Sequence, residues 1–460
     1  MKKIGIIGAG FCGTMTAVHL IENSKKPIEI ILINSKKNFN KGVAFDAFSE
    51  KHLLNVPTGK MSAFPDHPQH FLNWILEQEG FENMDSSMIE HSFLPRKTYG
   101  NYLTDIWEKA KKNALQNNIC LFVIESQVDD IDVKEKQISL DIKNIGQINV
   151  DACVLANGNN VPGNLKIKNM EFYTSPNYFQ NPWRPEAFEQ LQNDSKVLIL
   201  GSGLSMVDTV LSVSDQVNRG KIISVSPNGF NILPHRHNEI KYTKLTKQLK
   251  ENMSLYDLIK LIRLHTKSAQ KLGVSAAPII DSLRPYTQKL WISFSTKEQF
   301  HNRLRHLWNI ARHKIPIHTH DYIHKLINNG LLETKAGKII DMREKQGAVQ
   351  VEFFDKKENK IKTLLVDRVI NCTGPEFDIM KMENSFLKKG LLKGLITQDA
   401  LKMGITTQPE TFQVIRSDGQ PQNNLFTIGS NLRGNLLEST AVNELRWQSK
   451  RLAEILLEGH

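Results

Sequence analysis

The segment Gly8-Ala9-Gly10-Phe11-Cys12-Gly13 decides the fold of this chain. It has the spacing G-x-G-x-x-G and lies between an apolar, strand-like run at Ile4–Ile7 and a helical pattern. In that setting the first glycine makes a tight turn, the second lets the backbone approach a pyrophosphate, and the third lets helix and strand pack closely. The N-terminus of the helix then presents its free N–H groups to the phosphates. The segment therefore predicts a dinucleotide-binding site, with Cys12 packed beneath the loop as a small residue.

The same order of elements returns near the middle of the chain. An apolar run at Val197–Leu200 leads into Gly201-Ser202-Gly203-Leu204-Ser205-Met206, a helical pattern and a second apolar run at Ile222–Val225. In each copy three short alternating segments follow, and then a return strand that ends in Asn157-Gly158 or in Thr373-Gly374. We therefore expect an α/β fold with two Rossmann-like dinucleotide-binding domains, each carrying a small antiparallel meander.

A third element near the C-terminus indicates which dinucleotide the first domain binds. The apolar strand Leu425–Ile428 precedes Gly429-Ser430 and a helix that begins near Ser439. Two-domain flavoproteins use such an element to close over the flavin, where the positive end of the helix dipole favours negative charge on the reduced ring. We expect FAD in the first domain, contacted by Gly8, Gly10, Gly13, Val128, Asn157, Gly158, Gly429 and Ser430.

The expected ribose contact is unusual. The second strand ends in Asn34, where an acidic residue commonly grips the ribose hydroxyls. An asparagine amide still bonds a hydroxyl but lacks the charge, so we expect a weaker or water-assisted contact at Asn34.

The late strand also sets the domain order. Because Leu425–Ile428 is needed to finish the first sheet, the second domain is expected to be inserted in the first. We predict an FAD-binding domain at residues 1–160 and 375–460 and an NAD(P)-binding domain at residues 161–374. The lysine-rich, helical stretch at about 245–330 is expected as an elaboration of the second domain, with a lid as one interpretation.

The second glycine loop, with Gly201 and Gly203 as predicted contacts, lacks the third glycine. Met206 takes its place and is expected to widen the approach of helix to strand. That fits a cofactor that binds and dissociates in each catalytic cycle, NADH or NADPH. The alternative is a vestigial repeat that binds no ligand. No arginine follows Val225 where a 2′-phosphate would be clamped, although Arg236 lies a few residues further on. The choice between NADH and NADPH stays open.

Composition narrows the function classes. The chain has 460 residues, a formal net charge of +11, and hydrophobic and charged contents of 40% and 23%, as in soluble globular proteins. Its lysines are scattered, and no basic block with interleaved aromatics occurs, so we expect no nucleic-acid partner. No apolar stretch reaches the length of a membrane span. The 4 cysteines lie far apart without a C-x-x-C motif or a metal-ligand cluster, which excludes a dithiol relay and fits a cytoplasmic location.

Further segments carry a family resemblance. They are Lys41–Phe45, His52–Ser62 with the sequence H-L-L-N-V-P-T-G-K-M-S, Phe71–Trp74, Leu307-Trp308 with Arg312-His313, and Leu432–Gly434 with Glu438–Arg446. Over nearly its whole length the chain resembles bacterial FAD/NAD(P)-binding flavoproteins related to the flavin N-hydroxylating and Baeyer–Villiger monooxygenases. That family includes FAD-dependent urate hydroxylases and amino-acid N-oxygenating enzymes.

The resemblance implies an FAD that NAD(P)H reduces and that then reacts with oxygen to hydroxylate a small nitrogen-containing metabolite. In such enzymes the cofactor does the oxygen chemistry, while the protein excludes water and positions the substrate. One departure narrows the implication. The linker motif F-x-G-x-x-x-H-x-x-x-W of Baeyer–Villiger enzymes is met only as Tyr173, Ser175, Phe179 and Trp183, so we do not expect that activity.

The resemblance also suggests individual roles. Asn55 and Met61 are expected to border the flavin ring, or else to belong to a packed turn. Arg433 and Glu438 flank the closing helix and are candidates, with Asn55, for catalytic contact with flavin or substrate, a structural ion pair being the alternative. Weaker candidates for contact with nicotinamide or an anionic substrate are Arg312, His313, His235 and Arg236.

Three functions therefore follow from the sequence. The leading one is an NAD(P)H-dependent flavin monooxygenase acting on a small nitrogen-containing metabolite. The second is a flavin-dependent reductase or dehydrogenase that uses an acceptor other than oxygen, and the third is a non-catalytic flavin-binding redox module. The sequence names neither the substrate nor the oligomeric state.

Overall fold

The computed structural model describes every residue except 36–38, 135, 230, 236–241, 296, 383–384 and 459–460. Its first lobe is built on a six-stranded sheet of order β17-β18-β7-β1-β2-β3. The strands are β1 (Lys2–Ile7), β2 (Ile28–Asn34), β3 (Cys120–Glu125), β7 (Ala152–Leu155), β17 (Gln413–Ile415) and β18 (Pro421–Thr427). Neighbouring strands are parallel except β17 with β18.

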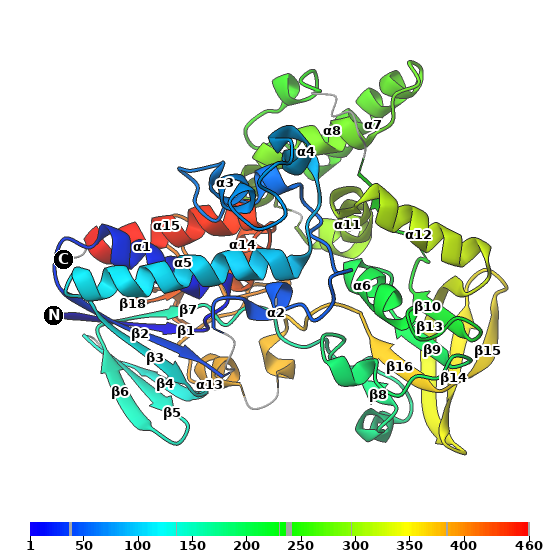
Figure 1. The fold of residues 1–460 in the computed structure, drawn as a ribbon, viewed down its shortest axis with the longest axis horizontal. Helices are drawn as coiled ribbons and strands as arrows, with labels where there is room; N and C mark the ends of the chain where they lie inside the picture. Colours follow the sequence, from blue (N-terminus) through cyan, green and yellow to red (C-terminus); the bar gives the residue numbers. More distant parts are fainter. Residues whose placement is uncertain are drawn as a thin grey trace.

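Both faces of this sheet are covered, which explains why its central strands are almost continuously apolar. Ile4 and Ile6 face the helical side, and Ile7, Ile31 and Ile33 face the other side. The helical side carries α1 (Phe11–Asn23), α5 (Arg96–Gln116) and α15 (Val442–Glu458) (Figure 1). The other side carries α13 (Phe386–Leu392) and a separate antiparallel sheet of β4 (Val128–Val133), β5 (Ile138–Ile142) and β6 (Gly146–Val150). Short helices complete the lobe: α2 (Gly42–Phe45), α3 (His70–Leu76), α4 (Ser86–His91) and α14 (Arg433–Leu436).

The second lobe is built on a seven-stranded sheet of order β15-β14-β13-β10-β9-β16-β8. The strands are β8 (Tyr178–Phe179), β9 (Lys196–Leu200), β10 (Lys221–Ser226), β13 (Leu332–Lys345), β14 (Ala348–Asp355), β15 (Lys360–Val366) and β16 (Arg368–Asn371). Helices α6 (Leu204–Val213) and α12 (Ile317–Asn328) pack on one face. All these strands lie between β7 and β17 in the chain, so the second unit is inserted in the first. This confirms the predicted fold class, while the boundaries at residues 160 and 374 stay proposals.

The two meanders are built differently. The first is a sheet of its own, whereas the second continues the parallel sheet of its lobe. Strand β13 pairs in parallel with β10 over Leu332–Ala336 and then antiparallel with β14 from Gly337 onward. A register shift between Ile339 and Asp341 bends the strand as it changes partners.

The helical elaboration forms a bundle against both lobes. It consists of α7 (Leu255–Gln270), α8 (Ala277–Ser282), α9 (Thr287–Ser293), α10 (Lys297–Gln299) and α11 (Arg305–Arg312), and short strands β11 (Leu233–Pro234) and β12 (Lys314–Ile315) pair beside it. Its apolar cluster around Trp291 extends to Leu401 and Leu437 of the first lobe. The indole N–H of Trp291 donates to the carbonyl oxygen of Gly434 at 2.7 Å. The elaboration of the second unit is therefore fastened to the first lobe.

Candidate functional site

The first glycine loop has the geometry that its spacing predicts. Gly8 has a φ of +104°, and a Cβ there would lie 2.3 Å from the carbonyl oxygen of Ala156. A Cβ at Gly13 would lie 1.9 Å from the carbonyl oxygen of Gly8. The N-cap of α1 is Gly10, which has no side chain to occupy the anion-binding end of the helix. The loop fits the pyrophosphate of a dinucleotide.

Asn34 fastens this loop to the end of β2. Its Oδ1 accepts a hydrogen bond from the backbone N–H of Ala9 at 3.2 Å. On the other side, the N–H of Asn40 donates to the carbonyl oxygen of Ala9 at 2.8 Å. A side-chain oxygen therefore orders the loop from within the protein, and the ribose contact of Asn34 stays a prediction.

The C-terminal element packs directly on the first loop. Gly429 has a φ of +77°, and a Cβ there would lie 2.9 Å from the Sγ of Cys12. Burial raises the pKa of the Cys12 thiol to about 12. Cys12 is therefore a small, uncharged residue packed at the loop, as the sequence predicts.

The predicted FAD contacts of the return strand and the C-terminal element lie together. The Nδ2 of Asn431 donates to the Oδ1 of Asn157 at 2.8 Å. Gly158 and Ser430 line one small cavity beside them. The Oγ of Ser430 is buried without a hydrogen-bond partner among the described residues, which fits a polar group supplied by a bound flavin nucleotide. Val128 differs, because its side chain is buried in the apolar cluster between the first sheet and β4–β6.

The second glycine loop keeps the turn but not the close packing. Gly201 has a φ of +110°, and a Cβ there would lie 2.5 Å from the carbonyl oxygen of Cys372. A Cβ at Gly203 would meet no atom within 4 Å. Met206 is buried beneath the loop, and the N-cap of α6 is Gly203, which has no side chain to cap the helix. The loop is suited to a phosphate and leaves more open space around its second glycine than Gly10 has.

A contact between the lobes escaped the sequence reasoning. Arg96 at the start of α5 and Asp208 of α6 form an ion pair of 2.9 Å, and their side chains are only 13% and 8% exposed. The Nε2 of His52 lies 2.9 Å from the Oγ of Ser212 and 3.2 Å from the carbonyl oxygen of Asp208. His52, the first residue of the H-L-L-N-V-P segment, thus contacts the helix that follows the second glycine loop. The available signal was Asp208 itself, the one charged residue of α6.

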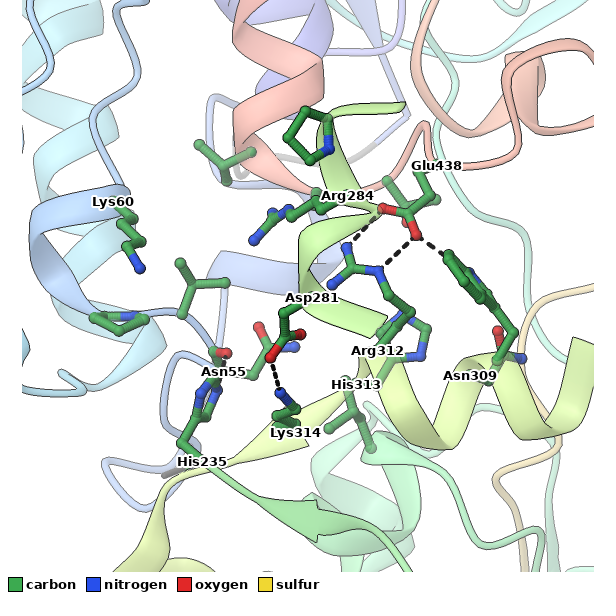
Figure 2. Close-up of a pocket in the computed structure, with 18 of the residues that line it drawn as sticks. Asn55, Lys60, His235, Asp281, Arg284, Asn309, Arg312, His313, Lys314 and Glu438 are labelled. Carbon is green, nitrogen blue, oxygen red and sulfur yellow. Dashed lines mark hydrogen bonds and ion pairs between the residues drawn. The ribbon is translucent and has the colours of Figure 1, made fainter. Parts of the chain in front are cut away.

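A cavity of about 680 Å³ lies where the two lobes and the helical bundle meet (Figure 2). The first lobe supplies Asn55, Met61 and the chain before α15 to its wall. The second lobe supplies Leu204, at the N-terminus of α6, and His235, whose Nε2 donates to the carbonyl oxygen of Asn55 at 2.9 Å. The remaining wall comes largely from the helical bundle and the residues just after it, including Asp281, Arg284, Tyr286, Trp308, Asn309 and Lys314.

Glu438 lines this cavity, but its carboxylate is already engaged. Arg312 donates from Nε at 2.8 Å and from Nη2 at 2.7 Å, and the indole of Trp308 donates at 3.2 Å (Figure 2). Although burial pushes the pKa of Glu438 upward, the hydrogen bonds from Arg312 hold it below its usual range. The structural ion pair is therefore present, and the partner of Glu438 is Arg312 rather than Arg433.

The other predicted polar candidates also reach the cavity wall. Arg433 and His313 line it, and the guanidinium of Arg433 lies 4.5 Å from the ring centre of Phe377. Burial, and then the charges of Arg312 and Arg433, lower the pKa of His313 to about 4. This imidazole is uncharged at neutral pH. Arg236 lies outside the described residues.

Among the described residues, no group of three or more His, Cys, Asp or Glu side chains is arranged to hold a metal ion. Over the same residues, no helix has both the length and the apolar character needed to cross a membrane.

Comparisons with known proteins agree with this fold and its first glycine loop. Residues 5–160 match a family model described as FAD-NAD(P)-binding. No curated protein sequence matches the chain. Solved structures match it over its full length, although at low sequence identity. L-lysine 6-monooxygenase from Pseudomonas syringae has a TM-score of 0.68 at 15% identity, covering 100% of this chain and 99% of that one.

Two other structures show how widely the fold is shared. Ornithine N-hydroxylase from Kutzneria sp. 744, with reduced FAD, NADP+ and L-ornithine, has a TM-score of 0.65 at 12% identity and covers 99% of each chain. Bacillithiol disulfide reductase from Staphylococcus aureus has a TM-score of 0.58 at 12% identity, covering 100% of this chain and 99% of that one. The expected cofactor class agrees with the family description. Residues 5–160 thus match an FAD-NAD(P)-binding family model, and the chain as a whole shares the fold of these solved structures.

Proposed function

We propose that the protein is an FAD-dependent oxidoreductase that takes electrons from NADH or NADPH and hydroxylates a small nitrogen-containing metabolite. One observation carries the proposal. The cavity of about 680 Å³ joins the start of α15, the H-L-L-N-V-P segment and the N-terminus of α6, which are the parts of both nucleotide-binding units that face each other. A flavin from one unit and a nicotinamide from the other meet in such a space.

The side chains of the cavity support a binding and positioning role. Thr440, Ala441 and Val442 bring the N-terminal end of α15 to the wall, where its dipole stabilises negative charge. Bound FAD supplies the hydride and oxygen chemistry there. The carboxylates of Glu438 and Asp281 are held by Arg312 and Lys314, so neither is free to act as a base. The chain's own residues orient the substrate and exclude water.

A reductase without oxygen chemistry is the second candidate, since bacillithiol disulfide reductase shares the fold. The cysteines argue against a disulfide substrate relay in this chain. Cys153 and Cys372 are buried, Cys120 is exposed on β3, and none of the 4 cysteines lines the cavity. All are free thiols, which also supports the proposed cytoplasmic location.

The test has two stages. Anaerobic mixing of the FAD-loaded protein with NADH or NADPH is expected to bleach the flavin, and failure with both refutes the proposal and favours a non-catalytic flavin-binding module. Aerobic turnover is then followed across amino acids, amines and purines, with NAD(P)H consumption compared with hydroxylated product and hydrogen peroxide. Product formation supports a monooxygenase. Rapid flavin reduction with peroxide as the sole product throughout the panel favours the reductase.

A further inference from the structure

Four of the cations that line the cavity are paired with carboxylates. Arg312 holds Glu438, Lys314 holds Asp281 at 2.5 Å, and Arg96 holds Asp208. Arg284 lies 3.8 Å from Glu444. Each of these cations thus has a carboxylate opposite it.

Arg433 differs from these four. It lines the same cavity, and neither a hydrogen bond from its guanidinium nor an ion pair is present within the part of the chain that the structure describes. Phe377 lies under the guanidinium at 4.5 Å, so one face of the group is covered by an aromatic ring. A guanidinium has five donors in a fixed planar fork, and those of Arg433 lack a protein partner.

The charges that act on the pKa of Arg433 come from one cation and one carboxylate. Burial, and then the charge of Arg305, lower the pKa of Arg433 to about 10. Arg305 itself lies with its Nη1 3.4 Å from the Nδ1 of His301. The carboxylate that raises the pKa of Arg433 is that of Glu438, whose two oxygens already accept from Arg312. Two arginines near each other and withdrawn from water repel, and a bound anion relieves that repulsion.

We propose that Arg433 is the anion-binding residue of the cavity and holds a carboxylate of the substrate through paired N–H donors. The inference deepens the proposed function, on which its substrate role rests. Arg433 shares the cavity wall with Thr440–Val442 at the start of α15, so the carboxylate is held beside the expected flavin. The substrate class is then a small amino acid or other carboxylate, and a diamine lacks the group that Arg433 recognises.

Matched ligand pairs test this with the FAD-loaded protein. Lysine is compared with cadaverine and benzoate with benzamide, because each pair differs at the carboxylate. Binding is read from the change in flavin absorbance and from the melting temperature, both without NAD(P)H. We expect the carboxylate of each pair to bind roughly tenfold tighter or better, as charge-assisted, bidentate hydrogen bonds do.

Variants locate the effect. Arg433→Gln is expected to weaken the binding of the carboxylates roughly 10- to 100-fold and to leave the affinities for cadaverine and benzamide unchanged. Arg433→Lys keeps the positive charge but loses the planar fork of donors. Its affinity for carboxylates is expected to lie between those of the natural protein and Arg433→Gln. Arg416→Gln is the matched control, since the side chain of Arg416 is partly exposed and pairs with Asp418 in the turn between β17 and β18. If Arg433→Gln does not fold, Arg433→Lys carries the comparison.

Four results overturn the proposal. The first is that carboxylates change neither the flavin absorbance nor the melting temperature, and the second is that Arg433→Gln still prefers carboxylates to the same extent. The third is a loss of FAD in Arg433→Lys, and the fourth is that the Arg433 variants raise the KM for NADPH but not the KM for NADH. The last would assign the anion to the 2′-phosphate of the cofactor. Failure of the proposed function is seen separately, because it appears as absent flavin reduction by NAD(P)H with carboxylate binding intact.

Discussion

The two glycine loops begin alike and are finished differently. In the first, Gly13 allows α1 to touch the loop, since a Cβ there would lie 1.9 Å from the carbonyl oxygen of Gly8. In the second, the buried Met206 stands at that place, and a Cβ at Gly203 would meet nothing within 4 Å. The first loop is also tied by Asn34 and Asn40 to the chain on either side of it.

The helices behind the loops differ as well. Met15 of α1 is fully buried among apolar side chains, whereas the corresponding Asp208 of α6 is a buried charge. The partner of Asp208 is Arg96 of the other lobe, so the second loop depends on contact between the lobes for its position. A tightly closed loop suits a resident FAD, and a more open loop held from outside suits a nicotinamide that enters and leaves.

The largest expected effect is at the third glycine. Gly13→Ala forces a methyl group into the backbone of Gly8 and is expected to cost about 3 kcal/mol or more, with loss of bound FAD. The second loop has Met206 at the third position, so the comparison uses its second glycine: Gly203→Ala adds a methyl group that meets no atom within 4 Å. It is expected to alter the Kd for NAD(P)H less than about threefold, within roughly 0.6 kcal/mol. FAD content and equilibrium titration measure the two. Equal losses in both variants would contradict the distinction between the loops.

The next effect concerns the contact that holds α6. Asp208→Asn leaves Arg96 buried without its carboxylate and is expected to cost about 3 kcal/mol in the free energy of unfolding. Asp215→Asn removes an exposed partner of Lys51 in the same pair of lobes and is expected to cost less than about 1 kcal/mol. Urea denaturation compares them, and a similar midpoint for both variants would show that the buried pair does not join the lobes.

A smaller effect is expected at the end of β2. Asn34→Ala removes the acceptor for the N–H of Ala9. It is expected to weaken the binding of FAD by about 1 kcal/mol, which raises the Kd roughly fivefold. Asn34→Asp keeps an acceptor and is expected to retain FAD at least as well as the natural residue. The Kd of the apoprotein for FAD measures both. An Asn34→Ala protein that binds FAD normally would leave the loop ordered by Asn40 alone.

The smallest effect is a pH dependence at the lobe contact. Burial, and then the charge of Arg96, holds the pKa of His52 below its usual value, although the charge of Asp208 opposes this shift. The unfolded chain therefore takes up the proton first, so stability falls as pH drops below about 6.5, by at most about 1.4 kcal/mol per pH unit. His52→Gln is expected to flatten this part of the curve of unfolding free energy against pH. An identical slope in variant and natural protein would place its origin elsewhere.

Much of the fold is readable because its signals are local. The spacing of Gly8, Gly10 and Gly13 and the return of the same pattern at Gly201 fix the turn conformations within a few residues. The strand before Gly429 belongs to the first sheet but comes after the second unit in the chain. Its position therefore shows that the second unit is inserted in the first. The same reading missed that β13 continues from a parallel into an antiparallel pairing, because no local pattern shows a strand changing partners.

The sequence by itself determined the two nucleotide-binding units, their order in the chain and the glycines that shape their loops, because turns and apolar periodicity depend on neighbouring residues. Only the tertiary structure decided which charges meet. It placed Arg312 on Glu438, Arg96 on Asp208, and left Arg433 without a carboxylate among the described residues. Such pairings join residues far apart in the chain, and their energies depend on burial, which no local pattern encodes.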